Sequence, residues 1–283
     1  MRRREFLWGA MASLLPSLVS LRSVAAPAPQ AGIWTAPLTD LHVHLDNSTL
    51  DLVLALSAER GVKFGIVEHA GTKENVYPKV LSNDEELNAY VEMLAGKPVY
   101  KGVQAEWTDW MGCFSKETLA KLDYIITDAM TMPDKAGKRM KLWEPTEDLG
   151  EVQVFMDRYV DWHVEIMTRE PIDVFVNVSW LPAAFAGDYE NLWTESRMTK
   201  VIETAKKFDI AIEISSGFEL PKPRFLRVAR EAGLKFAFGT NGRYPKMGLL
   251  DHSVKTALEV GLTPKDMFVP AADGQKAVQR RSY

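Results

Sequence analysis

The chain has very little cysteine: Cys113 is the only one among its 283 residues. A single thiol excludes an intrachain disulfide and any zinc site built from several thiolates. No histidine lies near Cys113 in the sequence, so we interpret it as a packing residue rather than a nucleophile. The chain also lacks a Gly-x-Gly-x-x-Gly turn after any apolar run, which argues against a dinucleotide-binding domain.

Long apolar runs are missing as well. The mildly apolar stretch that ends at Leu21 is interrupted by Gly9 and Pro16 and is shorter than the ~20 residues that span a bilayer. It follows the motif Arg-Arg-x-Phe-Leu at residues 3–7, which fits the twin-arginine export pattern, and small residues near Ala25 suit a signal peptidase. We therefore predict a signal peptide over residues 1–25, a linker over 26–37 and a periplasmic or otherwise extracytoplasmic location, without membrane insertion after cleavage.

Positive charge is not in excess. Lys and Arg number 34 against 38 Asp and Glu, a formal net charge of −4. Residues 1–25 hold four arginines and one glutamate, so the charge without them is −7. This balance argues against a nucleic acid or an anionic membrane as the partner and leaves a small-molecule substrate. The length suits one large α/β domain, and the oligomeric state is not predicted.

The sequence beyond residue 38 alternates short apolar runs with stretches whose apolar residues lie three or four apart. The runs are rich in β-branched and aromatic residues, which is typical of buried strands, and the stretches between them are typical of helices. Seven such pairs predict a parallel sheet with right-handed crossovers, and at this length a closed barrel is favoured over an open sheet. The predicted strands are Leu41–Leu45, Val62–Val67, Val99–Trp107, Tyr124–Ala129, Ile172–Trp180, Ile210–Ser215 and Lys235–Gly239. The predicted helices include Leu50–Ala58, Glu85–Leu94, Val152–Ile166, Met198–Phe208, Pro223–Ala232 and Leu249–Val260, and Thr131–Gly150 is expected to be a long loop.

His42-Val43-His44 closes the first predicted strand. Alternate side chains of a strand point the same way, so the two imidazoles are expected to project together. Two converging imidazoles make half of a metal site. In α/β barrels the reactive groups sit where strands end. The polar residues at the later strand ends are Glu68, His69, Glu106, Asp128, Asn177, Glu213, Asn241 and Arg243.

This order of motifs resembles the PHP superfamily, named for polymerase and histidinol phosphatase domains. The resemblance rests on His42-x-His44, Glu68-His69, the strand from Gly102 to Glu106, Ile212-Glu213-Ile214 and the end Gly239-Thr240-Asn241. It implies an α/β fold, a distorted (β/α)7 TIM-like barrel over residues 38–283, and a metal-dependent hydrolase that acts on phosphoesters.

The resemblance also implies a ligand set. His42, His44 and Glu106 look like ligands of a first metal, with Asn241 offering an amide oxygen. His69, sharing Glu106, looks like a ligand of a second, aided by Asp46 or Glu68. The family's bridging carboxylate commonly lies two residues after the glycine, where this chain has Gln104, so the register of Glu106 is open.

Other positions depart from the family pattern. Met130 and Asn177 stand where ligand histidines are usual, and Arg243 replaces the histidine at the seventh strand end. We therefore expect one divalent ion, Zn or Mn, with a second as the alternative.

The remaining strand-end residues are assigned to catalysis and to substrate. Glu68 or Asp128 is the expected general base. Arg243 is expected either to pair with a phosphate or carboxylate of the substrate or to form an ion pair with a strand-end acid. Asn177, Glu213, Trp107 and Trp180 complete the expected substrate-binding set.

Two other functions stay open. One is a non-catalytic descendant of this fold that binds a ligand through Arg243 and the tryptophans. The other is an amidohydrolase, because Leu41-His42-Val43-His44-Leu45-Asp46 also resembles the opening strand of adenosine deaminases. Those enzymes need further histidines after strands five and six, where this chain has Asn177 and Glu213.

Overall fold

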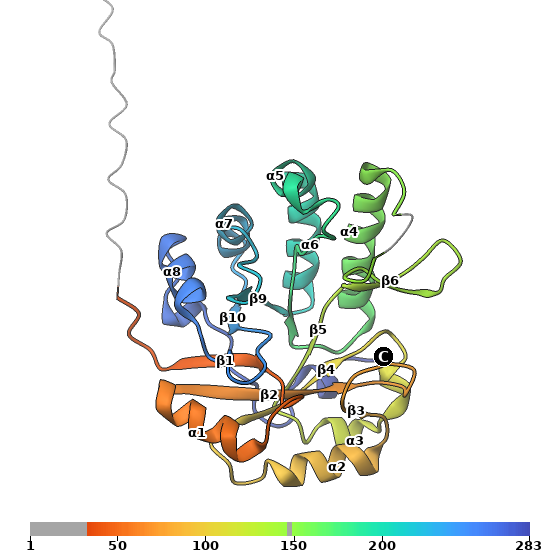
Figure 1. Ribbon diagram of the computed structural model, residues 1–283. Coiled ribbons are helices and arrows are strands. Elements are labelled where there is room, and N and C mark those ends of the chain that lie inside the picture. The colour runs from red at the N-terminus through yellow and green to blue at the C-terminus, as the bar shows by residue number, and fades with distance from the viewer. Residues whose placement is uncertain (1–32, 146–148) are drawn as a thin grey trace, which may run out of the picture. The chain divides into compact units, whose positions relative to one another are not determined.

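Seven parallel strands form the centre of the molecule (Figure 1). The computed structural model describes residues 33–145 and 149–283, so the predicted signal peptide and the first part of the predicted linker lie outside the described residues. In sheet order the seven strands are β1 (Leu38–Val43), β2 (Val62–Ala70), β4 (Tyr100–Ala105), β5 (Tyr124–Thr127), β8 (Val174–Phe175), β9 (Ala211–Ser215) and β10 (Phe236–Gly239). The short strand β3 (Val80–Leu81) pairs with β2 outside this path.

The ring of strands is nearly closed between β10 and β1. The amide of His44 donates to the carbonyl of Gly242 at 2.9 Å, and the amide of Gly242 donates to the carbonyl of His42 at 2.9 Å. The Asp40 carboxylate strengthens this junction by accepting from the amides of Thr240 (3.1 Å) and Gly248 (2.7 Å). The predicted (β/α)7 barrel is thus confirmed at the level of an α/β fold with seven parallel strands. The backbone of the His-x-His motif is part of its seam.

Alternation along the strands divides the core into two layers. An inner cluster fills the barrel, and a larger outer cluster lies between strands and helices. Tyr124 occupies the axis and donates its hydroxyl to the carbonyl of Leu41 at 2.8 Å. A Cβ at Gly65 on β2 or at Gly102 on β4 would lie less than 3 Å from Tyr124 atoms, so both strands carry glycine where the ring passes. The inner cluster consists of Leu41, Val67, Tyr124, Ile126, Val174, Val176, Ala211 and Ala237.

The helices pack outside the strands (Figure 1). Thr49 and Asn83 begin the first two helices by accepting from backbone amides three residues later, and Gly61 ends the first in the left-handed conformation. The longer helices are α1 (Leu50–Arg60), α2 (Asp84–Met93), α4 (Val152–Arg169), α6 (Glu195–Lys207), α7 (Pro223–Glu231) and α8 (Asp251–Glu259). Short helices are α3 (Lys116–Leu119), α5 (Tyr189–Leu192) and α9 (Ala277–Arg280), with 3-10 turns η1 (Trp110–Cys113), η2 (Ala186–Asp188) and η3 (Pro264–Asp266).

Two predictions from the sequence need correction. The predicted loop Thr131–Gly150 contains a hairpin, β6 (Thr131–Pro133) and β7 (Arg139–Lys141), which pair antiparallel. The predicted fifth strand, Ile172–Trp180, shrinks to the two residues of β8. Asn177 and Ser179 have φ of 50° and 66°, a conformation that leaves the extended ladder.

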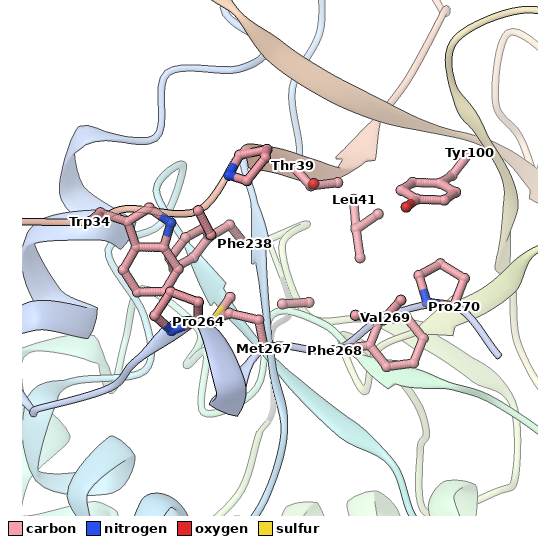
Figure 2. Close-up of a pocket in the computed structure, with 13 residues that line it drawn as sticks. Trp34, Thr39, Leu41, Tyr100, Phe238, Pro264, Met267, Phe268, Val269 and Pro270 are labelled. Atoms are coloured by element: carbon pink, nitrogen blue, oxygen red, sulfur yellow. The ribbon is translucent and has the colours of Figure 1, made fainter.

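A small apolar pocket lies at the amino-terminal ends of β1, β4 and β10 (Figure 2). Trp34, Leu41, Tyr100, Phe238 and Phe268 are among its lining residues, and its volume is about 150 Å³. This end of the barrel is opposite to the strand ends where the sequence places its polar residues. No helix in the described ranges is long and apolar enough to cross a membrane.

Candidate metal centre

Two histidines and an aspartate converge at the carboxyl ends of β1 and β2. His44 and Asp46 follow β1, and His69 is the penultimate residue of β2. One potential ligand atom from each of the three lies within 4.8 Å of the others. The rings of His44 and His69 stack with their centroids 4.7 Å apart and their planes at 16°. Over residues 33–145 and 149–283, no other trio of His, Cys, Asp or Glu is placed this way.

Four polar atoms of this trio are buried without hydrogen-bond partners in the described part of the chain. Both ring nitrogens of His44, Nε2 of His69 and Oδ1 of Asp46 are in this state. A buried polar group without a partner costs about 1–3 kcal/mol, so four such atoms on three neighbouring side chains call for a ligand. Two imidazole nitrogens and a carboxylate oxygen form a donor set that proteins use for catalytic zinc. The residues present therefore fit a divalent metal ion.

Protonation differs between the two histidines. Burial lowers the pKa of His44 well below its usual value, and the charges of His42, His69 and Arg243 add to this effect. Burial also acts to lower the pKa of His69, but the carboxylates of Asp46 and Glu106 outweigh it and raise that pKa to about 9. His44 is thus held as the neutral imidazole that a metal requires, while His69 must lose a proton when a metal binds.

Glu106 supports His69 rather than joining the trio. Its Oε1 lies 2.7 Å from Nδ1 of His69, and its Oε2 accepts from the Tyr77 hydroxyl at 3.1 Å. The Tyr77 ring stacks on His69, with centroids 3.7 Å apart and planes at 8°. A carboxylate on the far ring nitrogen fixes the orientation of a ligating histidine. The structure places the predicted ligand Glu106 in this role, and its ligation of a metal stays a prediction.

His42 is also placed beside the trio and not within it. Its Nδ1 lies 2.8 Å from Oε1 of Glu213, and its Nε2 lies 3.0 Å from Oε1 of Gln104. Both ring nitrogens are therefore engaged by other side chains. Gln104 and Glu106 share one face of β4, as alternation predicts, but they hold two different histidines.

Arg243 contacts the trio directly. Its Nε lies 3.0 Å from Oδ2 of Asp46. Its Nη1 donates to the backbone carbonyl of Asn241 at 2.9 Å and to the side-chain oxygen of Asn241 at 2.5 Å. The amide oxygen that was expected to bind metal is thus occupied by the guanidinium. Of the two interpretations of Arg243, the ion pair with a strand-end acid is present, although the acid is Asp46.

Asp128, Asn177 and Glu213 form a hydrogen-bonded set on the opposite side of the mouth. Oδ2 of Asp128 accepts from the side-chain amide of Asn177 at 2.9 Å, and Oε2 of Glu213 accepts from the backbone amide of Asn177 at 2.8 Å. Burial raises the pKa of Asp128 to about 6, and the nearby Glu106 charge contributes in the same direction. Asp128 is therefore a carboxyl group whose pKa suits proton transfer near neutral pH.

Glu68 lies next to His69 on β2 but on the other face. Consecutive strand residues point to opposite sides, and Val67 already belongs to the inner cluster, so Glu68 faces outwards where His69 faces inwards. Burial raises the pKa of Glu68 to about 7, and its Oε2 has no hydrogen-bond partner in the described part of the chain. Because Glu68 faces away from the barrel interior, Asp128 is the better candidate for the general base.

The two predicted substrate-binding tryptophans lie partly buried against the outer core. Trp107 packs against Trp162, with ring centroids 5.5 Å apart, and the guanidinium of Arg139 lies 5.4 Å from the Trp107 ring. Arg139 also donates to Asn75 and Asp109, so the β6–β7 hairpin is tied to the loops after β2 and β4. A substrate contact by Trp107 or Trp180 stays a prediction.

Backbone conformation at the strand ends is unusual. Trp107 follows β4 with φ 64°, Asn177 and Ser179 follow β8, and Asn241 follows β10 with φ 48°. Non-glycine residues in this region cost of order 1–3 kcal/mol each and cluster at functional sites. Four of them at one mouth of the barrel mark the same end that carries the histidines.

Two of the five metal ligands predicted from the sequence belong to the trio. From the sequence we identified His44 and His69, named Asp46 only as an aid to a second metal, and missed Tyr77. Tyr77 lies in the irregular segment between β2 and β3, where no periodicity predicts which side chain turns back onto the barrel.

Comparison with known proteins adds little. No protein-family model matches the chain, and no curated protein matches it. Among solved structures, an HpcH/HpaI aldolase from Desulfitobacterium hafniense DCB-2 matches 72% of this chain and 86% of its own, with 11% sequence identity and a TM-score of 0.38. At that identity and TM-score the likeness assigns neither a family nor an activity to this chain.

Proposed function

We propose that this protein is a metal-dependent hydrolase of the PHP type, acting on a phosphoester at the carboxyl mouth of the barrel. One observation carries the proposal: the ligand atoms of His44, Asp46 and His69 meet there, buried and largely without hydrogen-bond partners. Support for the PHP assignment comes from the order of polar strand ends around a seven-stranded parallel barrel, from His42-x-His44 to Glu213.

In this proposal the residues at the mouth have three roles: metal binding, orientation of a ligand and proton transfer. His44, Asp46 and His69 would hold a divalent ion, which supplies Lewis-acid activation of water and of the scissile group when bound. Glu106 orients His69 through its Nδ1. Asp128, held by Asn177 from the other side of the mouth, is the group that takes the proton from the attacking water.

The test is metal content with a matched histidine control. Protein purified without chelators should contain stoichiometric Zn or Mn, and His44→Ala should lose that metal and the hydrolysis of phosphoesters together. His252→Ala removes a partly exposed histidine from α8, outside the trio, and should keep both. Metal retained by His44→Ala would overturn the ligand assignment. Metal-loaded protein that hydrolyses no member of a phosphoester panel would overturn the activity.

A second candidate function is a non-catalytic ligand-binding protein. The observation that favours it is the Arg243–Asp46 contact at 3.0 Å, because the guanidinium already neutralises the carboxylate of the trio. Purified protein that is folded and free of metal, and stays so after incubation with Mn²⁺ or Zn²⁺, would favour this function over the hydrolase.

A further inference from the structure

Arg243 is held in place by three hydrogen bonds and keeps one nitrogen free. Its Nε contacts Asp46 and its Nη1 contacts two oxygens of Asn241. Nη2 has no partner within residues 33–145 and 149–283, and about a third of the side chain is exposed (36%). An arginine restrained in this way loses little further freedom when its remaining N–H groups bind a ligand.

Arg243 lines a groove whose charged side chains are all cationic. The groove has a volume of about 440 Å³ and is lined by the segments 216–217, 240–246 and Leu249. Its charged lining residues are Arg243 and Lys246, and no carboxylate lines it. Two of its three hydroxyl groups are engaged elsewhere, that of Thr240 with Asp40 and that of Ser216 with Ser253, and the third belongs to Tyr244. A ligand in the groove therefore meets cationic donors and no acidic side chain.

Arg243 also connects this groove to the trio. The oxygen of Asp46 that accepts from Arg243 is the one that lies 3.9 Å from Nε2 of His69. One carboxylate thus has the guanidinium on one side and a histidine of the metal centre on the other. Arg243 therefore contacts a candidate metal ligand and also lines the groove.

We propose that Arg243 is the oxyanion anchor of the site: its free Nη2 binds a phosphate group in the groove next to the metal centre. This rests on the proposed function for the identity of the anion but not for the existence of the anchor. Nη2 carries two charged N–H donors, which suit the oxygens of a terminal phosphate better than a neutral ester. The substrate class that follows is a phosphate monoester, whose phosphate meets the metal on one side and Arg243 on the other.

The experiment is a calorimetric titration of inorganic phosphate into the purified protein, once with metal loaded and once after removal of metal and chelator. Phosphate should bind in both states, and more tightly with metal. Arg243→Gln should weaken binding tenfold or more in both states, and Arg243→Lys, which keeps the charge but not the fork, should weaken it less. Arg227→Gln, which removes an exposed arginine paired with Glu259 outside the groove, should change binding less than threefold.

The outcomes separate this inference from the proposed function. Phosphate binding by Arg243→Gln equal to that of the unaltered protein in both states would overturn the anchor, whatever the metal content. An Arg243 effect in the metal-free state, together with absence of metal binding, would keep the anchor and overturn the hydrolase. Acetate that competes as well as phosphate at equal concentration would overturn the assignment to a phosphate. If Arg243→Gln fails to fold, as judged by circular dichroism, a loss of phosphate binding in folded Arg243→Lys supports the anchor and unchanged binding overturns it.

Discussion

His69 shows how a single side chain is prepared for metal binding. Its Nε2 belongs to the trio, its Nδ1 is bonded to Glu106, and its ring is covered by Tyr77. The carboxylate fixes the tautomer, since it requires a proton on Nδ1 and leaves Nε2 as the ligand. Tyr77 adds to this by stacking on the ring and by donating to the same carboxylate.

Replacing Tyr77 should therefore weaken metal binding without removing a ligand. Tyr77→Phe keeps the stacked ring and loses the bond to Glu106, so a decrease in affinity of a few fold is expected. Tyr77→Ala loses both, and the decrease should reach roughly tenfold or more, as for other partners of ligating histidines. Competition with a chromogenic chelator measures the affinity. Tyr100→Phe, at the opposite end of the barrel, is the control and should leave affinity unchanged. Equal affinities in all three variants would contradict the role of Tyr77.

Which of these side chains ligates a metal and which supports a ligand was only partly predictable from the sequence. Alternation along β1, β2 and β4 placed His44, His69 and Glu106 at one mouth, and the structure agrees. Which residue ligates and which supports depends on contacts between distant segments. His42 contacts Glu213, which lies 171 residues further along the chain, and this contact holds its ring outside the trio. Asp46 is held beside the histidines by Arg243, a contact that no local pattern indicates.

At the scale of elements, the strands and helices were the predictable part. The apolar periodicities gave all seven barrel strands in order, because each buries one side on the inner cluster and the other under a helix. The predicted strand boundaries are wrong where side-chain hydrogen bonds override the apolar pattern. The apolar residues Val176 and Val178 continue the strand pattern beyond β8, yet the left-handed backbone at Asn177 and Ser179 ends the pairing. In that conformation the side-chain amide of Asn177 donates to Asp128 and its backbone amide donates to Glu213.

The end of α4 carries a buried acid that makes stability depend on pH. Glu170 caps this helix, and its Oε2 accepts from the indole nitrogen of Trp110 at 2.8 Å. Burial raises the pKa of Glu170 to about 8, against the lowering effect of the Trp110 bond and of the charge of Arg281. Because the folded protein holds this proton more tightly than the unfolded chain, whose glutamate pKa is near 4.5, stability falls as pH rises between these two values.

Glu170→Gln should remove that dependence. The glutamine keeps an oxygen for Trp110 and has no charge to bury, so the variant should match the unaltered protein near pH 5 and exceed its free energy of unfolding by about 1 kcal/mol or more at pH 8. Urea denaturation at the two pH values measures the difference. Glu165→Gln removes an acid from the exposed face of the same helix and should show no such divergence. A Glu170→Gln variant that is less stable at both pH values would refute the raised pKa.

At the scale of the whole molecule, the barrel closes at the residues that hold the candidate metal centre. His44 contributes its imidazole to the trio and its amide to the seam with Gly242, while His69 lies on the adjacent strand. A metal ligated by His44, Asp46 and His69 would therefore join β1 to β2 beside the seam between β1 and β10. In the unfolded chain His69 is 23 residues away from Asp46 and the site is not preformed, so metal binds the folded state selectively and stabilises it by mass action.

Thermal unfolding should report this linkage. At a free metal concentration 100 times the dissociation constant, the stabilisation is about 2.7 kcal/mol, which for a domain of this size raises the melting temperature by roughly 5–10 °C. Removing the metal with a chelator should reverse the shift, and His44→Ala should melt at one temperature with or without metal. His252→Ala should keep the full shift, because its imidazole lies on α8 away from the trio. A metal-dependent shift that survives in His44→Ala would place the ion elsewhere. The metal would then not link β1 to β2 beside the seam.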